Sequence, residues 1–205
     1  MSIPTPFDPL GTLGGGLPPG WHIVESVYFD GNCCVDSGLS PERGMVFRFE
    51  LSDLSPSNGF FIGNGYDSGY VRFLPFAGYP HDGGQYVYAG GNATAGITLS
   101  PTPARYLAQA EYTDNSITLT VNGQTKTITN TENLDNVAHL GIGGMINMSG
   151  QASNRSAMRL YWLEVKQNGA TIAKFVPCKH DNGTFGVCNT KTGEICRVAQ
   201  GILKQ

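Results

Sequence analysis

Charged residues are scarce in this sequence: they make up 14% of its 205 residues, against about 25% in an ordinary globular domain. The net charge at pH 7 is −3, and basic residues never form more than isolated pairs. Nucleic-acid binding requires a positive stripe that displaces phosphate counterions, so this class of partner is excluded. No apolar run approaches the about 18 residues of a membrane-spanning helix, so membrane insertion is excluded too.

Several sequence signals of function are also missing. No Gly-x-Ser-x-Gly motif occurs, so the nucleophile of an α/β-hydrolase is lacking. The glycines of residues 63–69 are out of register for a dinucleotide-binding loop, and we interpret that segment as a bend between strands. The first eight residues have neither a basic region nor an apolar core, so we expect no secretory signal.

Cysteine is sparse and odd in number, so a fully paired disulfide framework would leave one thiol over. The spacing of the last three cysteines around His180 fits no compact zinc site. We interpret all five as reduced structural cysteines, with a single C-terminal bridge or a zinc site as the alternatives. The cysteines are Cys33, Cys34, Cys178, Cys188 and Cys196.

Glycine and proline are abundant: 28 and 12 residues, about a fifth of the chain, against about 12% on average. Residues 1–20 alone contain five prolines and five glycines, which exclude a helix or a central strand. We expect this segment to be an extended arm that orders against a partner subunit, or alternatively a flexible leader. A single domain, residues 21–205, would follow.

Hydrophobic residues beyond Trp21 recur with the period of two that is typical of half-buried strands. The clearest runs are residues 44–51, 104–113 and 116–121. Asn-Gly pairs at 122–123 and 168–169 predict two-residue hairpin turns, because both central residues of such a turn need positive φ. Asp30-Gly31 is a third candidate hairpin turn.

About a dozen short strands separated by turn signals predict an all-β fold, an antiparallel β-sandwich. No segment shows a helical period of 3.6 over three turns. The alternation weakens between Asn64 and Gly96, where glycine and tyrosine are most frequent, so we expect the longer loops there.

Two stretches resemble a known family. Residues 17–38 (LPPGWHIVESVYFDGNCCVDSG) are similar to the opening of concanavalin A-like, laminin G-like jelly-roll modules. Residues 159–169 (RLYWLEVKQNG), 175–180 (FVPCKH) and 186–193 (GVCNTKTG) are similar to their ending. The resemblance covers both ends of a domain spanning 21–200 and implies a jelly roll. Cys33-Cys34 and Val187-Cys188-Asn189 depart from the family pattern at positions that serve packing.

Modules of this type are common in bacteriophage virion and tail proteins and in surface proteins of gut bacteria. The resemblance therefore implies a virion protein displayed on capsid or tail, assembled in the host bacterial cytoplasm and carrying a lectin-like face for host or mucin glycans. The arm at 1–20 would bind other virion proteins. Glucanases of this superfamily carry Glu-x-Asp-x-x-Glu, and none of the seven glutamates here is followed two residues later by aspartate. We therefore expect no enzyme activity.

Two alternatives stay open. The chain could be a purely structural capsid decoration protein that cements capsomers without binding sugar, in which case we expect a homo-oligomer, with a trimer as the first choice. It could also be an adhesin on a bacterial surface, which would require an export route.

Aromatic and polar residues interleave between positions 64 and 88, which suits sugar binding, because rings stack on the apolar faces of sugars while polar groups bind hydroxyls. Alternatively, Tyr70, Tyr86 and Tyr88 are strand residues that pack across the sheet. Asp67 and Asp82 are weak calcium candidates without Asp-x-Asp spacing, and no other cofactor is expected. The candidate glycan-binding residues are Asn64, Tyr66, Asp67, Tyr70, Tyr79, His81, Asp82 and Gln85.

Overall fold

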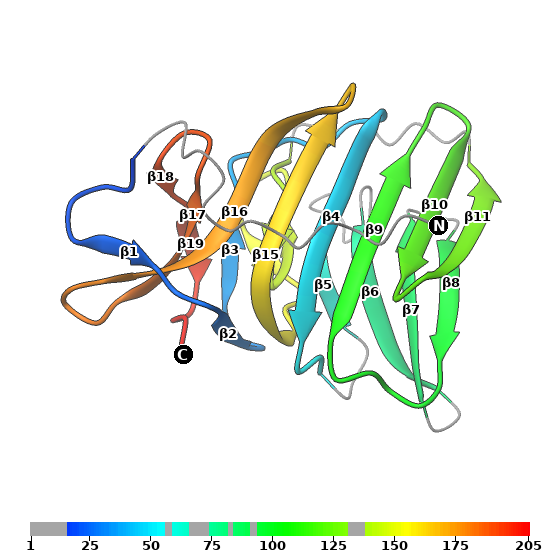
Figure 1. Ribbon diagram of the computed structural model, residues 1–205, viewed down its shortest axis with the longest axis horizontal. Coiled ribbons are helices and arrows are strands. Elements are labelled where there is room, and N and C mark those ends of the chain that lie inside the picture. The colour runs from blue at the N-terminus through cyan, green and yellow to red at the C-terminus, as the bar shows by residue number, and fades with distance from the viewer. Residues whose placement is uncertain (1–15, 56–58, 66–73, 82–83, 91–93, 131–137) are drawn as a thin grey trace.

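The structure, a computed structural model, describes residues 16–55, 59–65, 74–81, 84–90, 94–130 and 138–205. Its described residues form nineteen strands and no helix, so no helix in them could cross a membrane. The strands build two sheets that pack face to face (Figure 1). The expected β-sandwich is therefore confirmed, with more strands than the sequence predicted.

The first sheet has ten strands, all paired antiparallel. Eight form a continuous path, β1 pairs with β16, and β2 pairs with β15. The two extra strands are β1 (Trp21–Ile23) and β2 (Val27–Asp30). The path runs β11 (Gln124–Thr129), β10 (Ser116–Val121), β9 (Tyr106–Tyr112), β4 (Met45–Ser52), β15 (Ala157–Gln167), β16 (Ala170–His180), β17 (Phe185–Asn189) and β18 (Glu194–Ile195).

The second sheet has nine strands, and seven of them form its path. β13 (Gly144–Ile146) lies parallel to β5 and pairs with β14 (Ala152–Ser153). The path runs β19 (Arg197–Gln200), β3 (Cys34–Asp36), β12 (Gly141–Ile142), β5 (Gly59–Asn64), β6 (Leu74–His81), β7 (Gly84–Gly90) and β8 (Thr94–Leu99).

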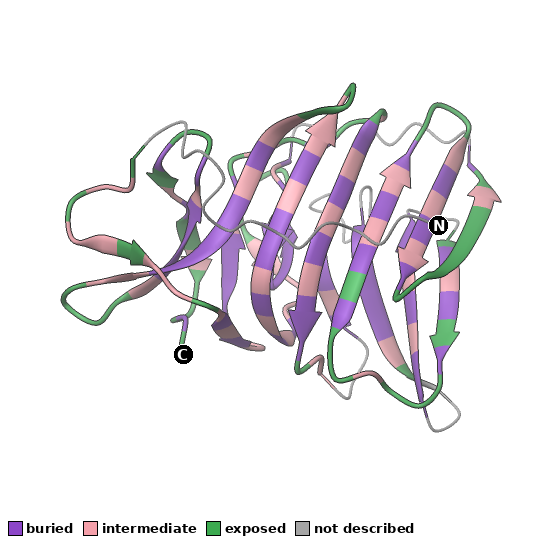
Figure 2. Ribbon diagram, in the orientation of Figure 1, coloured by how far each residue is buried: buried purple, intermediate pink, exposed green. Residues whose placement is uncertain are grey.

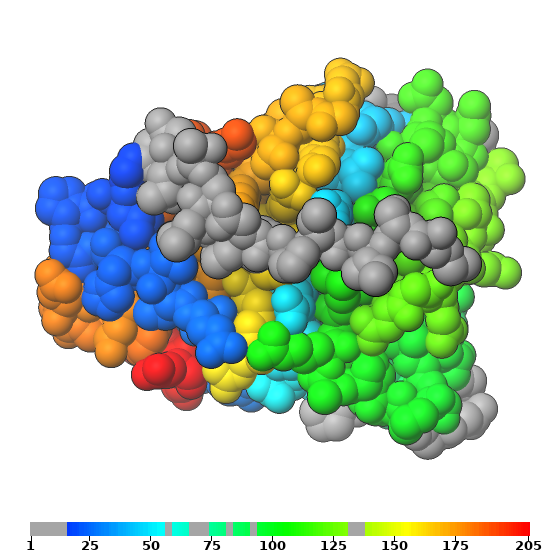
Figure 3. All heavy atoms as spheres, in the orientation of Figure 1, coloured from blue at the N-terminus to red at the C-terminus, as the bar shows by residue number. Residues whose placement is uncertain are grey.

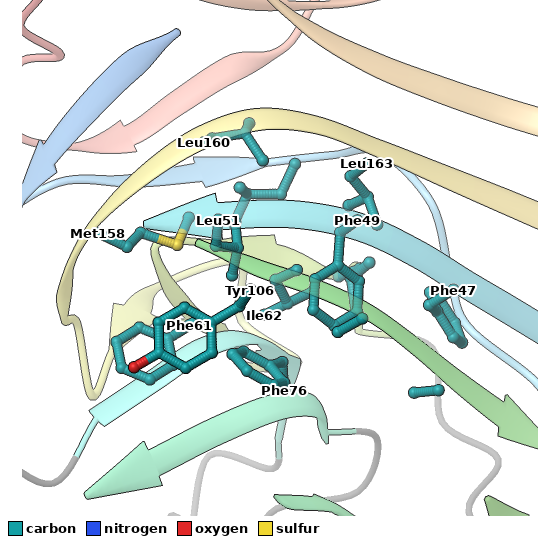
Figure 4. Close-up of a cluster of buried hydrophobic side chains, with 14 of the residues drawn as sticks. Phe47, Phe49, Leu51, Phe61, Ile62, Phe76, Tyr106, Met158, Leu160 and Leu163 are labelled. Atoms are coloured by element: carbon teal, nitrogen blue, oxygen red, sulfur yellow. The ribbon is translucent and has the colours of Figure 1, made fainter. Parts of the chain in front are cut away.

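Strand alternation builds the core between the two sheets. Buried and partly exposed residues alternate along β4, β9 and β15, which appear as coloured bands in Figure 2. The space-filling view shows these three strands, distant in sequence, side by side on the face of the first sheet (Figure 3). Their inward residues meet the second sheet: the Phe49 and Phe76 rings lie edge to face, with centroids 5.0 Å apart (Figure 4). Burial of this apolar layer is the main stabilising term of the fold.

Both predicted Asn-Gly hairpins are confirmed. Asn122 and Gly123 have φ of +47° and +85° between β10 and β11, and Asn168 and Gly169 have +50° and +78° between β15 and β16. Positive φ at both central residues gives the turn a twist that matches its strands.

One other expectation was wrong. Asp30-Gly31 does not close a hairpin, because β2 joins the first sheet and β3 the second, so this turn carries the chain across the sandwich. Where it is described, the segment from Asn64 to Gly96 contains β6, β7 and the first half of β8. The longer loops expected there would fall on residues 66–73, 82–83 and 91–93, which lie outside the described residues. Glycines weaken the apparent alternation there, although β7 pairs with both β6 and β8, with one register shift between Leu74 and Ala77 of β6.

The end of the predicted arm is part of the folded domain. Leu17 and Trp21 pack against a small apolar cluster around Cys178 and Cys188. The Asp181 amide donates to a carbonyl of the same segment, that of Gly20, at 2.9 Å. Residues 1–15 of the predicted arm lie outside the described residues.

All five cysteines are buried and unpaired. Burial raises the pKa of the Cys33, Cys34 and Cys178 thiols to about 12, and that of Cys188 to about 11. Burial also raises the pKa of Cys196. The thiols are thus protonated at neutral pH, which suits packing rather than a nucleophilic role.

Candidate functional site

Three tyrosines lie together on the outward face of the second sheet. Tyr86 and Tyr88 belong to β7, where they alternate with Val87 and Ala89 of the core, so their rings point away from it. Tyr79 of β6 is the direct cross-strand partner of Tyr86. We call these three residues the tyrosine face.

The rings of the tyrosine face contact one another. The centroids of Tyr79 and Tyr86 are 5.1 Å apart, those of Tyr86 and Tyr88 are 5.8 Å apart, and those of Tyr79 and Tyr88 are 6.4 Å apart. Such distances are typical of aromatic pairs with favourable ring geometry. Each side chain is partly exposed, so the cluster is a surface feature with an apolar body.

Small residues beneath the rings make room for them. Tyr88 lies between Ala77 of β6 and Gly96 of β8 in the sheet register. The Tyr86 ring reaches over Gly96 so closely that a Cβ there would overlap its hydroxyl. The aromatic rings therefore cover the backbone that small residues leave open, as aromatic residues do beside glycines in other sheets.

The hydroxyl of Tyr88 in the tyrosine face has a raised pKa. Burial, and then the neighbouring Tyr79 and Tyr86 hydroxyls, raise the pKa of Tyr88 above its ordinary value of 10.0. A neutral phenol both donates and accepts hydrogen bonds. Thr98, the exposed β8 partner of Tyr86, adds another hydroxyl beside this face.

The structure separates two of the other candidate glycan-binding residues, Asn64 and Gln85, from the tyrosine face. Asn64 is fully buried, and its Nδ2 donates to the Ala138 carbonyl at 2.9 Å. Gln85 is buried on the core side of β7. His81 lies in β6, one residue beyond Pro80. The remaining candidates lie outside the described residues: Tyr66, Asp67, Tyr70 and Asp82.

The calcium candidates Asp67 and Asp82 are therefore not placed by the structure. Across the part of the chain that is described, no three His, Cys, Asp or Glu side chains are grouped so that they could hold a metal ion.

A pocket of about 360 Å³, lined by both polar and apolar side chains, lies at the other end of the sandwich. In its wall, His139 Nδ1 lies 2.9 Å from Asp36 Oδ1. The same carboxylate oxygen accepts the Gly38 amide at 2.9 Å. The pocket is lined by Asp36, Ser37, Gly38, His139, Asn189, Glu194, Ile195, Cys196 and Arg197.

Our sequence analysis did not identify this pocket. Asp36 and His139 are 103 residues apart, and no local motif contains them both. They meet because β12, which begins two residues after His139, pairs Gly141 with Asp36. Arg197 is also far from Asp36 in the sequence, and it lies beside Asp36 because β19 pairs with β3. Only the strand order of the second sheet brings these residues together.

The sequence matches no protein-family model and no curated protein. Solved structures do resemble the chain. Domains LG4-5 of the mouse laminin alpha1 chain are similar with a TM-score of 0.48 and 19% identity, over 73% of this chain and 44% of that one. This chain thus spans less than half of that laminin structure.

Two further structures are similar. The heptameric SAP-like pentraxin from Limulus polyphemus has a TM-score of 0.48 and 12% identity, over 73% of this chain and 72% of that one. Alginate lyase A1-II', of polysaccharide lyase family 7, has a TM-score of 0.41 and 17% identity, over 66% and 67%.

Proposed function

We propose that the protein is a non-enzymatic glycan-binding module whose tyrosine face stacks on sugar rings. The observation that carries this proposal is the contact of three partly exposed rings, Tyr79, Tyr86 and Tyr88, on one outward face. Isolated surface tyrosines are ordinary, whereas a contiguous aromatic cluster on an exposed sheet marks a binding surface.

The chemistry of the tyrosine face suits saccharides. Sugar rings have apolar C–H faces that stack on aromatic rings, and their hydroxyls need hydrogen-bond donors and acceptors nearby. The raised pKa of Tyr88 keeps its hydroxyl protonated, and the exposed Thr98 lies opposite Tyr86. A charged ligand would find fewer partners here, because the tyrosine face contains no Asp, Glu, Lys or Arg side chain.

We assign no catalytic step. The Asp36–His139 pair orients an imidazole, but the thiol that shares its pocket, Cys196, has a pKa raised by burial and is protonated. A protonated thiol is a poor nucleophile. The sequence also lacks the glucanase and α/β-hydrolase motifs.

An oligosaccharide array tests this function. We would compare the wild-type protein with Gly96→Ala, which forces the Tyr86 ring away from the sheet, and with Tyr79→Ala/Tyr86→Ala. Tyr161→Ala is the matched control, since Tyr161 is a partly exposed tyrosine of β15 in the first sheet, stacked on Arg105 at 3.9 Å. We expect specific binding by the wild type and the control and a loss of at least tenfold in the other two. A folded wild-type protein that binds no glycan would overturn the proposal.

We further propose that the module is displayed on a bacteriophage capsid or tail and is assembled in the cytoplasm of the bacterial host. Support comes from the resemblance of residues 17–38 and 159–193 to virion-associated modules. The arm would bind other virion proteins. Deletion of residues 2–15, which spares the packed Leu17, should abolish incorporation into particles while leaving the melting temperature unchanged. Normal incorporation of this variant would contradict the assignment of the arm.

One observation favours a decoration protein as the second candidate. β11 ends the path of the first sheet, and five of its six residues are exposed. The unpaired backbone groups of an edge strand can pair with another chain. In this case the protein would be a homo-oligomer, with a trimer as the first expectation, and mass photometry of the purified chain would detect it. A strict monomer at micromolar concentration would weaken this candidate.

A further inference from the structure

We propose that the pocket around Asp36, His139, Glu194 and Arg197 is a second binding site, which takes a single hydroxyl-rich ligand of sugar size. It would act independently of the tyrosine face. The proposal rests on the cavity, on a carboxylate–imidazole pair already in place, and on the mixture of donors and acceptors in the wall.

The pocket lies where the edges of the two sheets meet. Asp36 and Arg197 are cross-strand partners on β3 and β19 of the second sheet, whereas Glu194 belongs to β18, the last strand on the path of the first. Four strand steps separate β3 from β7 in the second sheet, which is about 19 Å at ordinary strand spacing. The pocket is thus distinct from the tyrosine face.

Asp36 and His139 are held in place before any ligand arrives. Only 14% of the Asp36 side chain is exposed, and its Oδ1 accepts both the Gly38 amide and His139 Nδ1, each at 2.9 Å. A carboxylate can only accept, so the His139 proton is on Nδ1 and Nε2 remains as the ring's other hydrogen-bonding atom. With 44% of its side chain exposed, His139 is accessible to a ligand. Such fixed groups lose little conformational entropy on binding.

The rest of the wall supplies complementary groups. The Glu194 carboxylate accepts hydrogen bonds and the Arg197 guanidinium donates them, on opposite sides of Cys196 in sequence. Asn189 Oδ1 is already engaged by the amides of Lys174 and Lys191, which leaves its amide nitrogen as a donor. A ligand that fits this wall must both donate and accept around its rim, as the hydroxyls of a sugar do.

The size of the pocket limits its ligand. At about 360 Å³, it lies near the lower end of the about 300–1,000 Å³ range of small-molecule sites. The side chains of Ile195 and Cys196 add an apolar portion of wall, against which the C–H face of a sugar ring can pack. The pocket therefore suits one sugar unit better than a longer oligosaccharide.

Residue-resolved NMR tests the proposal with free monosaccharides as probes. Glucose, galactose, mannose, N-acetylglucosamine, glucosamine and N-acetylneuraminic acid would each be titrated into ¹⁵N-labelled wild-type protein. We expect at least one to shift the amides of Gly38, His139 and residues 194–197 in a saturable way. We expect Glu194→Gln/Arg197→Ala, both exposed positions, to weaken this binding at least tenfold. Lys126→Gln on β11, which removes a charge far from the pocket, should leave it unchanged.

Other outcomes would overturn the proposal. These are a folded protein whose pocket amides do not respond to any of the six sugars, or pocket variants that bind as tightly as the wild type. The two proposals can fail separately. Binding to immobilised oligosaccharides and its loss in Gly96→Ala test the tyrosine face, whereas the amide shifts of the pocket residues test the pocket. Shifts confined to residues 79–88 would support the tyrosine face and contradict a site in the pocket.

Discussion

The Tyr86 ring lies across the backbone of Gly96, on the neighbouring strand, in the space that a Cβ at residue 96 would occupy. The glycine and the tyrosine thus form one unit: the ring covers the bare backbone, and the missing side chain lets the ring lie close to the sheet. This relationship orders the tyrosine face, and it gives a way to disturb that face without removing an aromatic residue.

Gly96→Ala should therefore disturb the surface more than the fold. The Cβ of the new alanine would meet the far end of the Tyr86 side chain, which can turn outwards. We therefore expect a stability loss of about 1 kcal/mol. Gly84→Ala is the matched comparison, because its Cβ would overlap the backbone carbonyl of Leu99, which cannot move aside. We expect that change to cost about 3 kcal/mol. Urea unfolding of both variants checks this, and equal losses would contradict it.

The two Asn-Gly turns should respond differently to substitution. Asn122 and Asn168 both have positive φ, which costs a non-glycine residue other than Asn about 1 kcal/mol. Asn122 also accepts the Leu107 amide and donates to the Arg105 carbonyl, each at 2.9 Å. We therefore expect Asn122→Ala to lose about 2 kcal/mol and Asn168→Ala about 1 kcal/mol. Chemical unfolding measures both, and the opposite order would show that the side-chain bonds of Asn122 contribute nothing.

The C-terminal segment should show a pH-dependent contribution to stability. Asp30 accepts from Lys204 Nζ at 2.8 Å, and this bond, followed by the Asn32 amide, lowers the pKa of Asp30 below its ordinary 3.8. A lowered pKa means that the contribution is fully present above about pH 4 and is lost as the pH falls through the folded-state value.

Lys204→Met removes this pair. We expect the variant to melt below the wild type at about pH 6 and the difference to shrink as the pH falls from about 4 through the folded-state pKa of Asp30. Melting temperatures of both proteins, measured over this pH range, test the prediction. A difference that is constant across the range would assign the effect to packing instead of charge.

The five thiols should resist alkylation in the folded protein. All are buried, and burial raises the pKa of each, so that little reactive thiolate exists at about pH 8. We expect iodoacetamide to modify none of them in the native state within an hour or so and all five after unfolding, as intact mass would show. Rapid labelling of the native chain would place at least one thiol near the surface.

Much of the fold could be predicted from local sequence. The period of two over Gly44–Leu51 and 116–121 identified strands that the structure contains, and the Asn-Gly pairs located two hairpins. These signals work because strand alternation and positive φ are properties of a few consecutive residues. Asp30-Gly31 carried the same turn signal without a hairpin, since that signal does not say which sheet the next strand joins.

The candidate site was only partly predictable. The structure brings the rings of Tyr79, Tyr86 and Tyr88 into contact. Of these three, the sequence placed only Tyr79 among the candidate glycan-binding residues and gave Tyr86 and Tyr88 as strand residues that pack across the sheet. It did not distinguish Tyr79 from Gln85, whose side chain is directed to the core by the same alternation that turns the tyrosines outwards. Which face of a strand is buried depends on the sheet packed against it, and this is not a local property.

By itself, then, the sequence determined an all-β chain with its main strands and tight turns, because composition, alternation and turn chemistry act between near neighbours. Only the tertiary structure decided which strands share a sheet, which tyrosines face outwards, and that Asp36 meets His139 across 103 residues. Those outcomes depend on burying apolar surface between segments far apart in the chain, and the pocket exists only where that burial brings the edges of the two sheets together.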